Sequence, residues 1–179
     1  MANAGNATDF GDVLQGVYFG QNGVISNNTI GIFGGGYKDT NYAEQNVIQK
    51  ITIQTTGNAT DFGDMINGYG ISIGGTTDGT TGVWLGGKSN QGNATNVISK
   101  VTIGTPGNAT DFGDTTQLHY AASCSSSPTR GIIAGGAGGA GNTIEYLEIM
   151  TTGNASDFGD LTTDFRNTAG LSNGHGGLG

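Results

Sequence analysis

Aspartates in an octapeptide that occurs four times are the side chains whose spacing best suits chemistry. The octapeptide reads GNATDFGD at residues 5–12, 57–64 and 107–114, and GNASDFGD at 153–160. Hard cations such as Ca²⁺ bind several converging oxygens, and the Asn and the two Asp of each copy offer some of them. The first Asp of each DFGD segment is therefore a calcium candidate, namely Asp9, Asp61, Asp111 and Asp157.

The spacing of these carboxylates also indicates a structural role. Calcium loops follow the pattern D-x-[DN]-x-[DN]-G, which the D-x-x-D spacing of this sequence does not match. Aspartate side chains readily accept hydrogen bonds from backbone amides close to them at turns. We therefore expect exposed carboxylates that bond the backbone, with no bound metal and no cofactor.

The Asp-Phe-Gly core of each copy is also the metal-binding triplet of protein kinases, but its context here is wrong. A kinase carries one such triplet together with an H-R-D loop and a strand lysine in V-A-I-K form. This sequence has neither of those motifs and repeats the triplet four times. We expect the aromatic ring to anchor the core of each repeat instead. The four anchors are Phe10, Phe62, Phe112 and Phe158.

His119, Cys124 and Arg166 are the other reactive side chains near predicted strand starts and loops. A nucleophilic thiol needs an adjacent base. His119 and Cys124 are five positions apart on a predicted strand, so they should lie on opposite faces. We expect a small buried thiol and a surface imidazole. One Cys and two His are also too few for a zinc or oxidase-type metal site. The sequence therefore predicts a protein that is not an enzyme.

Composition narrows the function classes further. Of the 179 residues 36 are Gly, and six Lys and Arg face 14 Asp and Glu, for a formal charge of −8. Nucleic-acid binding depends on clustered cations, so we expect no nucleic-acid partner. No apolar run approaches the roughly 20 residues of a spanning helix, and the first residues lack the basic and apolar stretches of a secretory signal. We expect no membrane insertion.

The octapeptide sets the organisation of the chain. Its copies start 52, 50 and 46 residues apart. A period of about 40 to 50 residues is typical of β-propeller blades with four strands each. We interpret residues 1–179 as a single array of about three and a half repeats of ~50 residues. The repeats are 5–56, 57–106 and 107–152, with a partial repeat at 153–179.

Each repeat offers four short antiparallel strands. Alternating runs at 46–56, 96–106 and 142–152 place their apolar residues on one face. Shorter apolar runs that end in a glycine pair or triplet precede them, where Gly permits positive φ or close backbone approach. These runs lie at 30–36, 82–87 and 131–136, and further strands are predicted at 16–20, 69–73 and 119–124. No long helical period competes, so the predicted class is all-β with almost no helix.

A Gly-Asn pair separates each alternating run from the DFGD segment that follows it. Such a pair between two extended runs favours a tight hairpin, because both residues tolerate positive φ. We expect these turns at Gly57–Asn58, Gly107–Asn108 and Gly153–Asn154.

The connecting segments vary more than this frame. The stretches around 37–45, 76–81, 88–95 and 125–130 differ in length and composition, as is typical of recognition scaffolds. Aromatic residues on loops are common contacts for sugars and proteins. We therefore expect partner contacts at Tyr37, Tyr42, Tyr69 and Tyr120.

Both ends of the sequence read as partial units, which leaves three assemblies open. One chain closes on itself, two or more chains complement one another's partial units, or the sequence is a fragment of a longer array. Unsatisfied strand edges favour pairing between chains.

The glycine pair after a buried strand, the alternating strand and the hairpin resemble the kelch type of β-propeller. The phrase TTGNATDFGD at 55–64 is similar to repeats of kelch-like proteins of marine bacteriophages, described as tail-fibre or other virion components. The Tyr and Trp that usually follow the kelch glycine pair are absent, and Phe62, Phe112 and Phe158 take the aromatic role. The resemblance covers nearly the whole chain.

This resemblance implies a non-enzymatic structural or attachment protein of a bacteriophage virion or tail appendage. Its expected partners are copies of itself or other virion proteins, and a host-surface glycan. Its expected location is virion or extracellular. The alternative is a carbohydrate-binding, lectin-like propeller module. Fold alone fixes no activity, because kelch-type propellers serve many functions.

Overall fold

The structure is a computed structural model that describes residues 5–15, 17–18, 23–38, 41, 43–68, 74–89 and 92–170. These residues form strands and connecting segments and no helix, so the all-β prediction is confirmed. Three four-stranded antiparallel sheets account for most of the strands. Tyr42, Tyr69 and the strand predicted at 69–73 lie outside the described residues.

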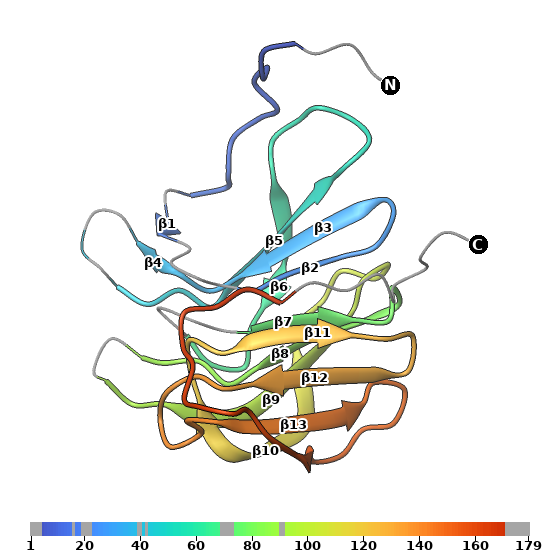
Figure 1. Ribbon diagram of the computed structural model, residues 1–179. Coiled ribbons are helices and arrows are strands. Elements are labelled where there is room, and N and C mark those ends of the chain that lie inside the picture. The colour runs from blue at the N-terminus through green and yellow to red at the C-terminus, as the bar shows by residue number, and fades with distance from the viewer. Residues whose placement is uncertain are drawn as a thin grey trace.

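The strands of each sheet follow one another in chain order (Figure 1). The first sheet contains β2 (Val24–Ser26), β3 (Ile30–Gly34), β5 (Val47–Thr52) and β6 (Thr60–Asp64). The second contains β7 (Gly74–Thr77), β8 (Thr81–Leu85), β9 (Thr95–Thr102) and β10 (Thr110–His119). The third contains β11 (Ser123–Ser126), β12 (Arg130–Ala134), β13 (Thr143–Glu148) and β14 (Ser156–Asp160). A separate pair joins β1 (Val17–Tyr18) to β4 (Tyr37–Lys38).

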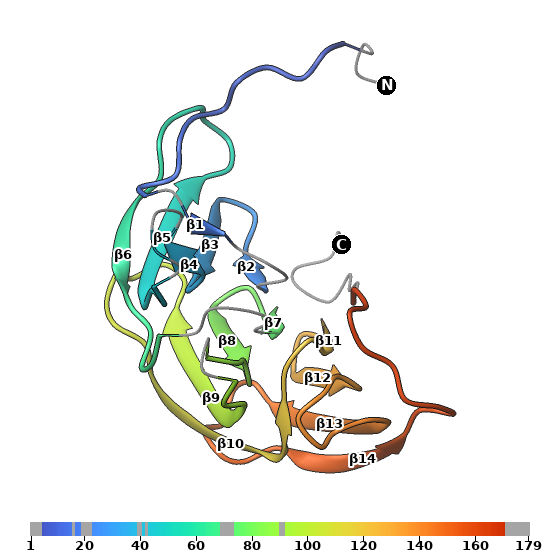
Figure 2. The same ribbon diagram turned by 90° about the vertical axis from the view of Figure 1, so that its left-hand side faces the viewer.

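The three sheets lie side by side in an arc (Figure 2). Their first strands, β2, β7 and β11, line the inner side of the arc, and their last strands, β6, β10 and β14, line the outer side. On the inner side Gly75 approaches Gly23 so closely that a Cβ atom on Gly23 would overlap the backbone of Gly75. The absence of side chains therefore lets the first strands approach one another.

Short polar turns connect the first and second strands of every sheet. Asn27 Oδ1 accepts hydrogen bonds from the amides of Thr29 and Ile30, both at 2.8 Å. Asp78 and Ser127 bond the amides two and three residues ahead in the same way. These turns have the same length and the same hydrogen-bond pattern, so the variability expected at 76–81 and 125–130 does not extend to their backbone. Polar turn residues of this kind favour hairpins because their side chains bond the local backbone.

The glycine pairs after the second strands have the positive φ that the sequence predicts. Gly86 and Gly87 have φ of 66° and 124°, and Gly135 and Gly136 have 66° and 99°. A Cβ atom on Gly86 would overlap the carbonyl oxygen of His119. These positions therefore require Gly for both its conformation and its size.

The hairpin predicted at the Gly-Asn pairs is wrong. The last paired residues of β5 and β6 are Lys50 and Thr60, and the chain between them turns at 52–55, where the Thr55 amide donates to the Thr52 carbonyl at 3.3 Å. Neither Gly57 nor Asn58 has positive φ, and the pairs at 107–108 and 153–154 follow the same pattern. The Gly-Asn pairs bond a neighbouring segment instead of closing a turn.

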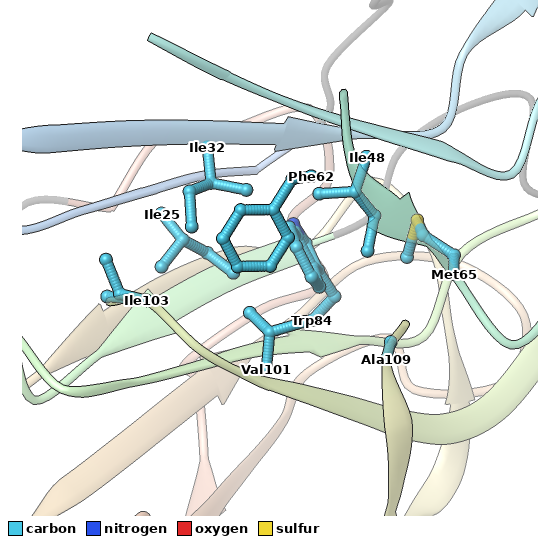
Figure 3. Packing of buried hydrophobic residues seen from close by; sticks show 9 residues of the cluster. All are labelled: Ile25, Ile32, Ile48, Phe62, Met65, Trp84, Val101, Ile103 and Ala109. Atoms are coloured by element: carbon cyan, nitrogen blue, oxygen red, sulfur yellow. The ribbon is translucent and has the colours of Figure 1, made fainter. Parts of the chain in front are cut away.

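The hydrophobic core lies between the sheets in two clusters. Figure 3 shows the cluster between the first and second sheets, where the ring of Phe62 lies beside Trp84 and Val101. The second cluster joins the second and third sheets around Phe112, Leu147 and Ile149. Among the described residues, both clusters therefore bury apolar side chains of one sheet against a neighbouring sheet, as expected of repeat proteins.

Replacing Phe112 with Ala tests this core. Phe112 is buried, whereas its equivalent Phe158 is exposed. We expect Phe112→Ala to lower the free energy of unfolding by about 3–5 kcal/mol, as loss of a buried aromatic ring does, and Phe158→Ala to change it little. Urea unfolding monitored by circular dichroism measures both. Equal effects of the two substitutions would show that the ring does not anchor the core.

Candidate functional site

The repeated octapeptides meet one another at junctions between consecutive copies. At the junction of the second and third copies, the Gly107 amide donates to the Phe62 carbonyl and the Ala109 amide to the Asp64 carbonyl, both at 2.7 Å. The Asp64 amide donates in return to Asn108 Oδ1 at 3.0 Å. The DFGD segment of one copy therefore receives the Gly-Asn-Ala segment of the next copy.

The bonds of Asp64 recur at the other two junctions, and the glycine-amide bond recurs at the first, where Gly57 donates to the Phe10 carbonyl at 2.8 Å. Between the first and second copies, Asp12 donates to Asn58 Oδ1 at 2.9 Å, and its carbonyl accepts from the Ala59 amide at 2.8 Å. Between the third and fourth copies, Asp114 makes the equivalent bonds with Asn154 and Ala155 at 3.0 and 2.9 Å. Three junctions with the same Asp–Asn and Asp–Ala bonds therefore link four copies that are far apart in sequence.

The glycine of each DFGD segment makes this contact possible. Gly11, Gly63 and Gly113 have φ of 143°, 149° and 145°. A Cβ atom on any of them would overlap the carbonyl oxygen of the glycine that opens the next copy, which is Gly57, Gly107 or Gly153 respectively. Both the conformation and the close approach exclude other residues. Gly57, Gly107 and Gly153, predicted as turn residues, instead supply backbone groups to this contact.

The calcium candidates bond the backbone. Asp61 Oδ1 accepts from the amide of Gly63 at 3.1 Å, and the other three copies repeat this bond at 3.0 Å. All four carboxylates, Asp9, Asp61, Asp111 and Asp157, are exposed. In the part of the chain that the structure describes, no three His, Cys, Asp or Glu side chains form a group that could hold a metal ion.

The four phenylalanine anchors occupy two kinds of surroundings. Phe62 and Phe112 retain 3% and 2% of their accessible surface, whereas Phe10 and Phe158 retain 38% and 58%. The inner two copies lie between two sheets, and the outer two have a sheet on one side at most. The structure therefore brings the sequence-predicted anchors into a core only where a second sheet is present.

A buried polar cluster between the second and third sheets was not predicted from the sequence. His119 and Glu145 are fully buried, and His119 Nε2 lies 2.8 Å from Glu145 Oε1. His119 Nδ1 lies 3.0 Å from the carbonyl oxygen of Gly135. Both ring nitrogens therefore lie within hydrogen-bond distance of an oxygen atom. The expected surface imidazole is wrong, because His119 closes the end of β10 against the third sheet.

Further hydrogen bonds hold the Glu145 carboxylate. The amides of Thr116 and Gln117 donate to its two oxygens at 2.7 and 3.1 Å. Burial tends to raise the pKa of Glu145, but the bonds from His119 and Thr116 outweigh burial and hold that pKa below its usual range. The cluster ties the C-terminal half of β10 in the second sheet to β13 of the third sheet.

One signal in the sequence could have revealed this cluster. In the aligned strand runs the position of Glu145 is taken by Gln49 and Ser99, so all three sheets carry a polar residue on a buried face. Gln49 Oε1 accepts a hydrogen bond from the Leu14 amide at 2.6 Å, as Glu145 does from Thr116. A polar residue recurring within an apolar face indicates a bonding role, which Gln49 and Glu145 fulfil, whereas Ser99 Oγ has no hydrogen-bond partner among the described residues.

Cys124 is separated from His119 and is unsuited to nucleophilic chemistry. The single strand predicted at 119–124 is wrong, because β10 ends at His119 and β11, which contains Cys124, begins at Ser123. The Cys124 side chain is half-buried. Burial raises the pKa of the Cys124 thiol to about 12. Because the thiolate is the nucleophile, the neutral thiol has little reactivity near pH 7. Arg166 lies in an exposed segment after the third sheet.

Tyr37 and Tyr120, two of the four predicted partner contacts, lie beside the connections that leave the glycine pairs. Tyr37 pairs with Tyr18 between β4 and β1, and burial and the nearby Glu44 raise its pKa. Tyr120 forms a bridge with Ala137, and Lys88 Nζ lies 4.6 Å from the centre of its ring. Tyr42 and Tyr69 lie outside the described residues.

Comparison with family models and with curated proteins finds no match for this chain. Among the described residues no helix is long and apolar enough to cross a membrane.

Gly113→Ala tests the junction contact. We expect a loss of at least about 2 kcal/mol in the free energy of unfolding, because a strained φ costs about 1–3 kcal/mol and overpacking adds a similar amount. Gly153→Ala is the matched control, since no atom lies within 4 Å of its added Cβ. Thermal and urea unfolding measure both variants. Equal stability of the two would mean that the close approach does not constrain the fold.

Glu145→Gln tests the buried pair. Because the pKa of Glu145 is lowered by folding, its carboxylate contributes stability above the unfolded pKa of about 4.3, and that contribution is lost as pH falls through the folded value. We expect the free energy of unfolding of the variant to be lower by about 3–5 kcal/mol at neutral pH. Its stability should also fall less steeply than that of the wild type as the pH is lowered. Glu148→Gln, which breaks only the exposed contact with Arg130, should change little. If Glu145→Gln loses stability with falling pH as steeply as the wild type, the carboxylate of Glu145 does not make this contribution.

Proposed function

We propose that this protein is a kelch-like β-propeller array that serves as a non-enzymatic structural or attachment component of a bacteriophage virion or tail appendage. The observation that carries the proposal is the structural role of the repeated octapeptide. Its backbone groups, its glycines and its inner phenyl rings join one sheet to the next. The most strongly repeated part of the sequence thus maintains architecture.

The propeller assignment is supported by strand order and by the place of each strand. The first strands of the three sheets adjoin on the inner side of the arc, and the fourth strands lie on the outer side (Figure 2). The fourth strand of each sheet comes from the octapeptide that opens the next repeat, so consecutive repeats share a sheet. Both features are typical of propeller blades.

A non-enzymatic role is supported by the state of the reactive groups. The carboxylates of the octapeptides bond local amides. His119 and Glu145 are bonded to each other and buried, and the Cys124 thiol has a raised pKa. A catalytic site needs an acid, a base or a nucleophile that reaches substrate. These groups stabilise packing instead.

A recognition role is supported at one end of the sheets. The connections between second and third strands, at 35–46, 86–94 and 135–142, leave from the left side of Figure 1 and differ from sheet to sheet. Tyr37, Tyr120 and Lys88 lie at this end. We call it the variable end. Loops of differing sequence on a rigid frame are common binding surfaces.

A carbohydrate-binding role is the alternative, and one contact favours it. The ring of Tyr120 is stacked by the Lys88 ammonium and is only half-buried. A tyrosine fixed in this way offers a rigid apolar face with a polar edge, which suits sugar rings. The attachment role and the carbohydrate-binding role are compatible. If the ligand is a host-surface glycan, the same loops would serve both.

Binding of fluorescently labelled protein to intact bacterial cells and to a glycan array tests the proposal. We expect Tyr37→Ala and Tyr120→Ala to weaken binding by roughly tenfold, as loss of an interface aromatic does. Gln54→Ala, at an exposed turn on the opposite end, is the control. Mass spectrometry of purified virus particles should detect the chain. Absence from particles together with no cell or glycan binding would overturn the proposal, and glycan binding without particle association would favour the alternative.

A further inference from the structure

The two outermost faces of the array expose the residues that the internal junctions bury. On the third sheet, Phe158 is 58% exposed, whereas its equivalents Phe62 and Phe112 are buried. On the first sheet, Ile53 is 42% exposed, whereas Ile103 and Ile149, its equivalents in the second and third sheets, are buried. These faces are therefore the two halves of one more junction.

The outer edge of β14 has the form of an unoccupied junction. Gly159 has φ of 141°, close to the values at Gly63 and Gly113. A Cβ atom on those two glycines would overlap the next copy, whereas no described residue lies within 4 Å of a Cβ placed on Gly159. The edge that receives a Gly-Asn-Ala segment elsewhere is therefore free of described neighbours here.

The matching Gly-Asn-Ala segment on the first sheet is Gly57–Ala59. In this structure it is bonded by Asp9–Asp12 of the same chain. That segment covers the sheet poorly, because Phe10 retains 38% of its accessible surface and Ile53 stays exposed. Asp9–Asp12 therefore makes the backbone bonds of a junction but is not part of a sheet, whereas the DFGD segments of β6 and β10 are.

We propose that the third sheet of one copy docks on the first sheet of a second copy. In this contact Asp157–Asp160 of β14 replaces Asp9–Asp12 of the second copy on Gly57–Ala59. The two segments have the same sequence, DFGD, so the exchange breaks and forms the same backbone hydrogen bonds. The net gain is burial of Phe158 against the exposed apolar side chains of the first sheet, which favours association.

A second copy fits these faces because each internal junction already packs the same two surfaces together. One surface carries the equivalent of Phe158, and the other carries the equivalent of Ile53. The two faces differ from each other, so copies join head to tail, and such contacts close into rings or extend into filaments. Each chain carries a formal charge of −8. Association should therefore strengthen with added salt, which screens the repulsion between copies.

Sedimentation velocity of the full chain over a range of concentrations tests the inference. We expect reversible self-association that is weakened by about tenfold or more in Gly159→Ala, a loss of about 1.4 kcal/mol or more. Because Gly159 has positive φ, a second variant, Phe158→Asp, places a charge on the docking face without that strain. Melting temperatures of both variants show whether the monomer fold is intact. A wild-type chain that stays monomeric, or unaltered association in both folded variants, overturns the proposal.

Two variants of the segment at 5–12 identify the exchange. A side chain at Gly11 would overlap the carbonyl of Gly57, so Gly11→Ala should release Asp9–Asp12 and strengthen association. Asn6→Ala should leave association unchanged, because Asn6 has no part in the exchanged contact. Weaker association in Gly11→Ala would show that Asp9–Asp12 is itself the segment donated between copies, and weaker association in Asn6→Ala would place the contact on residues 5–7. Either result overturns the exchange.

The inference goes beyond the proposed function, since it concerns how copies join and not what the loops bind. Failure of cell or glycan binding leaves it untouched. Failure of self-association likewise leaves the variable end free to bind a host surface.

Discussion

The arrangement of the sheets depends on one backbone contact. The α-carbon of the glycine in each DFGD segment packs against the carbonyl of the glycine that opens the next octapeptide. At each junction a glycine with positive φ brings two backbones closer than any Cβ atom would allow. The approach places an Ala amide and an Asn side chain within hydrogen-bond distance of the preceding segment at every junction. Because the close approach is made by backbone, it recurs at each of the three junctions, and two of these junctions set how one sheet follows the next.

Three further sets of contacts stabilise the array once the sheets lie next to one another. On the outer side the octapeptides bond one another, between the sheets the branched and aromatic side chains form two clusters, and on the inner side glycines let the first strands approach. A single sheet would expose both apolar faces, so each depends on its neighbours. The high glycine content thus reflects repeated close approach of backbones and not chain flexibility.

The sequence predicted the second and third strands of each sheet well because their signals are local, whereas the strand predicted at 119–124 is divided between β10 and β11. Alternating apolar residues and glycine pairs report the conformation of their own segment, and both were found where expected. The hairpin predicted at the Gly-Asn pairs was wrong because it also rested on a local signal. A local rule assigned Gly57 and Asn58 to a turn, whereas their partners are Phe10 and Asp12, more than forty residues away in sequence. His119 was placed on the surface because its partner, Glu145, lies in a strand of a different sheet.

The sequence by itself determined the class of the fold, the period of the repeat and the residues that every copy shares, because periodicity and glycine content act through backbone conformation. Only the tertiary structure decided which copy of each motif is buried. Four identical DFGD segments become two buried anchors and two exposed ones according to whether a second sheet packs against them. Burial depends on neighbours in space, so identical sequences acquire different surroundings.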